Sequence, residues 1–278
     1  MKPRVIITGA GGYLGSILMR LFQVQGWETV PWTRGGPAGR GVRFVLGEDI
    51  PTSSMAGAQA LIHCAYDFRP TKWKEAQRIN SGGSLRLLAA AKAAKIPRLI
   101  FISTMSAFPG CVSMYGKLKL EVEEFCLAQG VFCVRPGLLW SAQPGGMYQR
   151  LSQMAGRLPV LPLFGGGQQK LAFSHAEDLA AGLEIFCRGK ETPPDQALVT
   201  ASPQLFPFRE ILKTLACLQG KNPCFFPIPA WPVLWGLRLA ELLRLPAPFK
   251  SDSLISLLHQ DPNPIFSSRI RFREWPPA

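Results

Sequence analysis

An apolar segment near the N-terminus leads directly into a turn that contains three regularly spaced glycines. Gly9, Gly12 and Gly15 follow this strand, and an amphipathic segment over Leu14–Gln25 comes next. In such a strand–turn–helix unit, the first glycine permits the tight turn, the second lets the backbone approach a ligand, and the third allows close packing of helix on strand. The helix N-terminus adds free amides and a partial positive charge. The pattern therefore predicts a diphosphate-binding turn.

Composition is typical of a globular chain. Of 278 residues, 47% are apolar and 18% are charged, with no disordered or low-complexity tract. The first strand is expected from about Arg4, which leaves no room for a signal peptide, so a cytoplasmic location is expected. The cysteines form no C-x-x-C pair and have no histidine at metal spacing, which predicts reduced, mostly buried thiols and no metal site. They are Cys64, Cys111, Cys126, Cys133, Cys187, Cys217 and Cys224.

The formal net charge of +13 is spread along the chain. Nucleic-acid binding is typical of a concentrated basic stripe or a binding motif, and the sequence has no block of five or six like charges. The charge instead favours anionic cofactors and substrates, or weak peripheral contact with an anionic membrane surface. The sequence leaves the oligomeric state open, and a homodimer is compatible with it.

Strand and helix signals alternate through the first half of the chain, which is typical of a parallel sheet with helices on both faces. This predicts an α/β fold with a doubly wound parallel sheet (Rossmann) over residues 1–139. Two long helices are expected, at Trp73–Ala94 and Met114–Gln129. Further strands are expected at Thr29–Thr33, Val42–Leu46, Ala60–Ala65, Arg98–Ser103 and Val131–Arg135.

Prolines and aromatic residues become frequent after Trp140. Residues 140–278 are therefore expected to form mainly a smaller, irregular C-terminal lobe that closes over the cofactor and supplies the substrate pocket. The most apolar stretch, Cys224–Phe249, is interrupted by prolines and is a poor membrane span. Its second part, Trp231–Leu245, has the spacing of an amphipathic helix, and we expect it to cover the pocket rather than to bind a membrane.

Tyr115 and Lys119 are four residues apart on a predicted helix, so their side chains share one face. A tyrosine titrates near pH 10 and is a poor acid–base catalyst at neutral pH, but a neighbouring ammonium would lower its pKa. Ser103 and Thr104 stand at the carboxyl end of the fifth strand, where open α/β sheets bind ligands. This arrangement indicates proton exchange with a substrate oxygen held by a hydroxyl.

Together these features resemble the extended branch of the short-chain dehydrogenase/reductase superfamily, also called the NAD-dependent epimerase/dehydratase family. Six landmarks occur in the family's order and cover the first 140 residues almost continuously before one reappears later. They are the glycine turn Thr8–Gly15, the pair Asp49-Ile50, the strand end His63–Tyr66, Asn80 with Gly83, the segment Arg135–Trp140, and the segment Phe173–Ala180.

The resemblance implies roles for individual residues. Tyr115 would be the general acid/base, Lys119 would bind the nicotinamide ribose, and Thr104 would orient the substrate oxygen. His63 and His175 would be structural. In relatives the Phe173–Ala180 motif belongs to the Rossmann body, so residues 170–200 should return to it. The cofactor would contact Gly9, Gly12, Tyr13, Leu14, Gly15, Arg34, Asp49, Ile50, Cys64, Ala65, Tyr66, Lys119 and Pro136.

Three departures from the family pattern bear on the reaction. Dehydratases carry an acidic pair where this chain has Met105 and Ser106, which argues against dehydration. Leu138 replaces an asparagine that touches the substrate diphosphate in nucleotide-sugar enzymes. Thr104 and Tyr115 are also closer in sequence than is usual, which predicts a more open or rearranged pocket.

The second strand ends in Thr33 and Arg34 rather than in an acidic residue. An acidic side chain there would bind the ribose hydroxyls of NAD, whereas an arginine suits a 2′-phosphate. The sequence therefore favours NADP(H), with NAD(H) as the alternative cofactor.

Three functions follow from these residues. The first is an NAD(P)(H)-dependent oxidoreductase that moves hydride to or from a carbonyl or hydroxyl carbon of a hydrophobic or modest-sized small molecule. The second is a nucleotide-sugar epimerase with the same Thr-Tyr-Lys set. The third is a regulatory protein that senses NADP(H), although such a protein need not retain that set.

Overall fold

The computed structural model of the protein describes residues 2–36, 41–189, 192–243, 245 and 249–276. Its main element is a seven-stranded sheet in the order β10-β6-β5-β4-β1-β2-β3, in which every neighbouring pair is parallel. The predicted doubly wound α/β fold is therefore confirmed. The strands are β1 (Arg4–Thr8), β2 (Glu28–Thr33), β3 (Val42–Arg43), β4 (Ala60–His63), β5 (Arg98–Ile102), β6 (Phe132–Pro136) and β10 (Leu198–Thr200).

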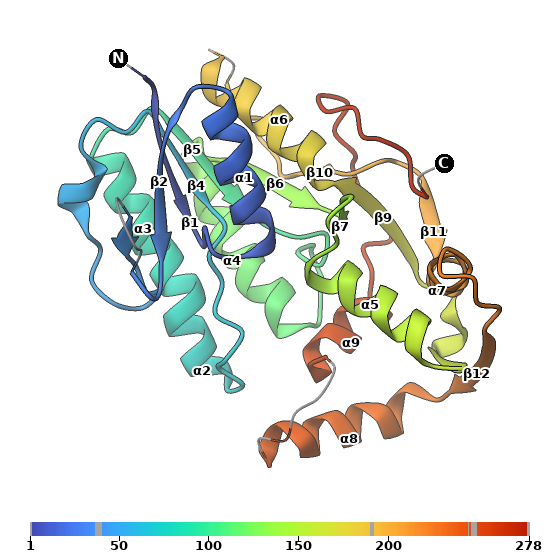
Figure 1. Cartoon of the computed structure of the whole chain (residues 1–278). Helices are drawn as coiled ribbons and strands as arrows, with labels where there is room; N and C mark the ends of the chain where they lie inside the picture. The colour runs from blue at the N-terminus through green and yellow to red at the C-terminus, as the bar shows by residue number, and fades with distance from the viewer. Residues whose placement is uncertain (1, 37–40, 190–191, 244, 246–248, 277–278) are drawn as a thin grey trace.

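Helices cover both faces of this sheet (Figure 1). Alternate residues of β1 point to opposite faces, so Val5 and Ile7 pack with α1 (Tyr13–Val24) and α6 (Ala176–Arg188), while Ile6 packs on the other side. That second face is covered by α3 (Gly82–Ala93) and α4 (Met114–Ala128). Apolar strands buried on both faces are the reason for the near-continuous hydrophobic runs in the sequence.

The long helix expected over Trp73–Ala94 is interrupted by one wide turn. It consists of α2 (Trp73–Ala76), a π-helical segment over Gln77–Ser81, and α3. Within the wide turn, Asn80 accepts from the backbone N–H of Asp67 at 2.7 Å and donates to its carbonyl at 3.0 Å. Such π-turns are frequent at functional sites, and this one fixes the loop that follows β4.

The remaining elements build a lobe beside the carboxyl ends of the large sheet (Figure 1). Its core contains Phe173 stacked on Trp275, with ring centroids 4.0 Å apart. Residues 170–200 are divided between the two parts of the molecule. Strand β9 (Lys170–His175) belongs to the lobe, whereas α6 packs on α1 and β10 extends the large sheet beside β6. The lobe comprises β7 (Leu138–Trp140), α5 (Gly146–Arg157), β8 (Val160–Phe164), a 3₁₀ turn (Gly165–Gly167), β9, β11 (Leu205–Pro207), α7 (Phe208–Cys217) and β12 (Cys224–Ile228). A second 3₁₀ turn, Thr52–Met55, precedes β4.

Two helices complete the lobe, α8 (Ala230–Leu242) and α9 (Ser251–Leu258). The expectation that the first of them covers the pocket is wrong, because α9 lines the cavity described below and packs against α4. Figure 1 shows α8 at the edge of the molecule, away from the large sheet. Among the described residues, no helix is both long and apolar enough to cross a membrane.

Candidate active site

The glycine turn has the geometry that its sequence predicts. Gly9 has a φ of +67°, and the backbone N–H of Gly12 donates to its carbonyl at 2.9 Å. A Cβ on Gly15 would lie 2.2 Å from the Gly9 carbonyl oxygen, and one on Gly9 would lie 2.9 Å from the backbone nitrogen of Ala65. Neither position has room for a side chain, because a fixed backbone stands in the way.

This turn fits the diphosphate of a dinucleotide. Gly12 is the N-cap of α1, and the first backbone bond of the helix runs from Ser16 back to it, so the amides of Tyr13, Leu14 and Gly15 have no partner within the helix. No acidic side chain lies in this first turn. Leu14 is buried in the core, and the Tyr13 hydroxyl donates to Ser141 Oγ at 3.0 Å. The arrangement leaves amide donors and a positive helix end for phosphate oxygens.

The end of β4 lies against the same turn. The backbone N–H groups of Cys64 and Ala65 donate to the carbonyl and the hydroxyl of Thr8, each at 3.3 Å. His63 is buried between the hydroxyls of Thr8 and Ser84, at 2.7 and 2.8 Å, and burial lowers its pKa to about 3. A neutral histidine with both ring nitrogens engaged has a structural role here.

Arg34 lies beside the buried carboxylate of Asp67, which no sequence motif indicates. Its guanidinium is 3.6 Å from Asp67, whose other oxygen is 2.6 Å from Arg69. The Arg69 hydrogen bonds hold the pKa of Asp67 below its usual range, despite its burial. Arg34 is itself 60% exposed, so it remains accessible to a ligand. Asp49 is exposed, and Ile50 packs against the core.

Tyr115 is half-buried at the start of α4, where its phenol is hydrogen-bonded to the Thr104 hydroxyl. Its ring packs edge-on against Tyr66 at 4.8 Å and beside Phe68 at 5.6 Å. Burial raises the pKa of Tyr115 to about 12; the Thr104 hydrogen bond opposes this shift, and the carboxylate of Asp252 adds to it. The structure thus brings Thr104 and Tyr115 together.

Lys119 differs from the sequence-based expectation. Its amine donates to the carbonyl of Ile102 at 2.6 Å and lies 4.5 Å from the centroid of the Phe101 ring. Burial lowers the pKa of Lys119 to about 8. The expected lowering of the Tyr115 pKa is wrong for this arrangement, because desolvation of the phenol dominates. The Lys119 amine nevertheless lies beneath the aromatic rings, 6.0 Å from the centroid of Tyr115.

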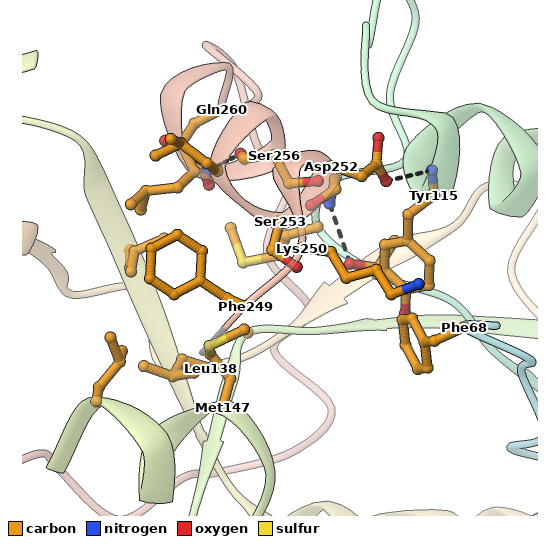
Figure 2. Close-up of a pocket in the computed structure, with 18 of the residues that line it drawn as sticks. Phe68, Tyr115, Leu138, Met147, Phe249, Lys250, Asp252, Ser253, Ser256 and Gln260 are labelled. Carbon is orange, nitrogen blue, oxygen red and sulfur yellow. Dashed lines mark hydrogen bonds between the residues drawn. The ribbon is translucent and has the colours of Figure 1, made fainter. Parts of the chain in front are cut away.

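A cavity of about 350 Å³ opens beside Thr104 and Tyr115. Figure 2 shows Tyr115 and Phe68 on one side of it, and Leu138, Met147 and Phe249 on the other. Its charged lining residues are Asp67, Lys250 and Asp252, and the rest of the lining is largely apolar. The apolar part includes Met105, Met114, Met147, Met154, Phe68, Phe164, Phe208, Phe249, Leu138, Leu151, Leu171, Leu254 and Leu257, and Tyr66 and Pro136 also contribute.

No sequence signal indicates the part that α9 plays. Asp252 accepts from the backbone N–H groups of Met114 and Tyr115, at 2.7 and 2.9 Å, so it caps the helix that carries the tyrosine (Figure 2). Ser113, the local N-cap, accepts from Gly116 at 3.1 Å. Only Ser113 could have been recognised from sequence, because a serine just before a helix is a common capping signal.

Comparison with known proteins agrees with this geometry. Residues 5–198 match the model of the NAD-dependent epimerase/dehydratase family. A ceramide reductase of Caulobacter vibrioides (strain NA1000 / CB15N) is 29% identical over 279 residues, a match that covers 94% of this chain and 86% of that protein.

Solved structures share the fold. MoeE5 in complex with UDP-glucose and NAD has a TM-score of 0.69 at 22% identity, with 81% of this chain and 85% of that chain covered. The NAD-dependent NDP-hexosamine 5,6-dehydratase TunA has a TM-score of 0.66 at 18% identity, with 92% and 96% covered. With the family match over most of the chain, these likenesses lead to one conclusion: the protein is an NAD-dependent enzyme that belongs to the NAD-dependent epimerase/dehydratase family.

Proposed function

We propose that the protein is an NAD(P)H-dependent reductase of a ketone on a long-chain, lipid-like molecule, with Tyr115 as the proton donor. The observation that carries this proposal is the apolar cavity beside Thr104 and Tyr115. Support also comes from the relative that matches most of the chain, which is named a ceramide reductase.

The cavity lining favours acyl chains over nucleotide sugars. Methionine, leucine and phenylalanine side chains gain free energy when they bury hydrocarbon, and flexible methionines adapt to chains of different shape. A nucleotide diphosphate would bring negative charge toward Asp67 and Asp252, with Lys250 as the cation in the lining. Asp67 is already paired with Arg34 and Arg69, so one amine opposed by the Asp252 carboxylate remains, which is a poor set for a diphosphate.

The chemistry assigned to the chain's own residues is proton donation. With a pKa raised to about 12, Tyr115 is protonated at neutral pH, which suits an acid that donates to a carbonyl oxygen. The Thr104 hydroxyl, already bonded to the phenol, is placed to hold the same oxygen and to stabilise the phenolate that forms. Lys119 supplies a nearby positive charge beneath the rings. The reduced dinucleotide, when bound at the glycine turn, supplies the reducing equivalents.

We assign the cofactor preference to NADPH on the basis of Arg34, which is accessible at the end of β2. Arg34→Ala should weaken NADPH binding by about 1.5–3 kcal/mol and leave NADH binding almost unchanged. Arg43→Ala is the matched control, because Arg43 is on the neighbouring strand and pairs with Glu48 at 2.7 Å. Titration of both dinucleotides tests this assignment, and equal affinities in the unmutated protein would refute it.

Substrate class is tested by following nicotinamide absorbance with purified protein, NADPH and a ketone-bearing long-chain amide in mixed micelles. We expect consumption of NADPH, and no interconversion of UDP-glucose and its epimers. Because epimerisation begins with oxidation of the sugar, UDP-glucose is assayed separately with NAD⁺ or NADP⁺. Epimer formation there without net change in nicotinamide absorbance would support the nucleotide-sugar epimerase instead, whose substrate class is suggested by the complex of MoeE5 with UDP-glucose and NAD. Tight NADPH binding without turnover of either the long-chain ketone or the nucleotide sugar would favour a regulatory protein that senses NADP(H).

Tyr115→Phe tests the role of the phenol. The substitution retains the ring that packs on Tyr66 and Phe68, so folding and NADPH binding should survive. Turnover should fall by roughly 10²–10⁴-fold, the usual contribution of a positioned proton donor. Thr104→Ala should lose turnover but still bind the cofactor. Lys119→Ala should lose turnover and also bind the cofactor more weakly. Unchanged turnover in Tyr115→Phe would end the assignment.

A further inference from the structure

One face of α8 exposes large apolar side chains to solvent. Trp231, Trp235, Leu239 and Leu242 have exposed fractions of 68%, 67%, 56% and 78%. They are spaced by four, four and three residues, so they form one continuous stripe along the helix. We call these four residues the outer stripe.

The opposite face of α8 is also apolar. Leu237 is buried in the core of the C-terminal lobe, and Val233 and Leu234 pack against that core. A helix that is apolar all round is normally buried on every side. Since the described residues cover α8 on one side only, the outer stripe requires another apolar environment.

Charge around α8 indicates which environment this is. Residues 208–258, from the start of α7 to the end of α9, carry a net positive charge, with six basic and three acidic residues: Arg209, Lys213, Lys221, Arg238, Arg244 and Lys250 against Glu210, Glu241 and Asp252. The Glu241 carboxylate is engaged in capping α9, where it accepts from the backbone N–H and the hydroxyl of Ser251 at 2.7 and 2.9 Å. An exposed apolar stripe in a basic segment suits anionic lipid, whereas a second copy of the chain would bring like charges together.

The residue types and length of α8 agree with a position on a bilayer. Tryptophan prefers the boundary between headgroups and acyl chains, because its ring is apolar and its N–H is polar. The 13 residues of α8 span about 20 Å, too little for the hydrocarbon core. A helix with these properties lies in the plane of the membrane surface.

We propose that α8 docks the protein on an anionic membrane surface, with the outer stripe inserted at the level of the lipid headgroups. Through the contact between Glu241 and Ser251, α8 is joined to α9, which lines the cavity. Docking therefore holds the cavity close to the lipid phase.

The proposal is tested by co-flotation with vesicles of phosphatidylcholine alone and of phosphatidylcholine mixed in equal parts with phosphatidylglycerol. The protein should float with the anionic vesicles, and its tryptophan emission should shift to the blue. The triple variant Trp231→Ser, Trp235→Ser, Leu242→Ser should bind at least about tenfold more weakly. Arg238→Gln should weaken binding by about fivefold and reduce its salt dependence.

The matched control is Val24→Ser with Ile185→Ser. These apolar side chains are 81% and 66% exposed on α1 and α6, so the control removes exposed apolar side chains from another part of the surface. It should bind vesicles like the unmutated protein. Retained NADPH binding by every variant shows that it is folded, and none of these readouts depends on the proposed reductase activity.

Two results would overturn the proposal. One is equal flotation of the triple variant and the control. The other is failure of the unmutated protein to float with the anionic vesicles. A dimer in light scattering that the triple variant converts to monomer would then assign the outer stripe to a second copy of the chain.

Discussion

Removal of the Asp252 carboxylate should both destabilise the protein and change its pH profile. Asp252 lies on α9, yet both of its oxygens accept backbone N–H groups at the start of α4, from Met114 at 2.7 Å and Tyr115 at 2.9 Å. The negative charge lies at the positive end of the helix, where it is favourable. Its proximity also raises the pKa of Tyr115.

The size of the effect follows from these two hydrogen bonds. Loss of a capping side chain costs about 0.5–2 kcal/mol, and hydrogen bonds to a charged group are at the strong end of the range. Ser113 still caps Gly116 in the variant, so we expect Asp252→Ala to lose about 2 kcal/mol rather than the sum of both bonds. For a chain of this size that corresponds to a fall of about 4–8 °C in Tm. Asp252→Asn retains one acceptor oxygen and should lose about half as much.

The pH effect has a definite sign. The carboxylate raises the pKa of Tyr115, so its removal lowers that pKa. Because reduction requires the protonated phenol, turnover should begin to fall at a lower pH in Asp252→Ala and Asp252→Asn than in the unmutated protein. If Asp252 were only a structural cap, its removal would lower the Tm but would leave the pH at which turnover falls unchanged. We call this high-pH fall in turnover the alkaline limb.

Thermal unfolding and pH–rate profiles together provide the assay. The control is Asp195→Ala, which removes an exposed carboxylate of the same charge. If Asp252→Ala unfolds at the same temperature as Asp195→Ala, the capping argument is wrong. If the alkaline limb stays in place, the electrostatic link between Asp252 and Tyr115 is wrong.

Further predictions concern the cofactor turn and the buried histidine. Gly15→Ala should abolish dinucleotide binding or destabilise the turn, because its Cβ would lie 2.2 Å from the Gly9 carbonyl oxygen, whereas Gly11→Ala, with no atom within 4 Å, should bind dinucleotide normally in calorimetry. His63 has a folded pKa of about 3, below its value in the unfolded chain, so the stability it contributes is present above about pH 6.5 and is lost as the pH falls. Urea unfolding should show a loss of about 2 kcal/mol between about pH 6.5 and 4.5 from this group, and His63→Asn should remove that part of the slope; an unchanged slope in the variant would contradict the assignment.

The sequence alone was sufficient for the sheet, the glycine turn and the family. These features depend on local patterns: apolar runs of strand length, glycines at fixed offsets, and helix signals between them. The positions of Thr104 and Tyr115 also followed from local signals, since a strand end and a helix start of the same βαβ unit converge at one edge of the sheet. The steric need for Gly9 and Gly15 shows why such patterns are strict.

The tertiary structure decided what lies against these residues. Asp252 reaches Tyr115 across 137 positions of sequence, and Arg34 meets Asp67 across another long separation. Neither contact produces a periodic or local pattern in the amino-acid sequence. The pKa of Tyr115 is a further example, because the burial that raises it depends on every element that excludes water from the phenol, whereas the spacing alone pointed only to Lys119.

The same distinction applies to the two C-terminal helices. The sequence located an apolar helix near residues 231–245 but could not say which of its faces would be covered. That outcome depends on the fold, in which α9 takes the place beside the cavity and leaves the outer stripe of α8 exposed. Hydrophobic periodicity identifies a face that must be buried, and only the arrangement of the surrounding elements determines whether protein is there to bury it.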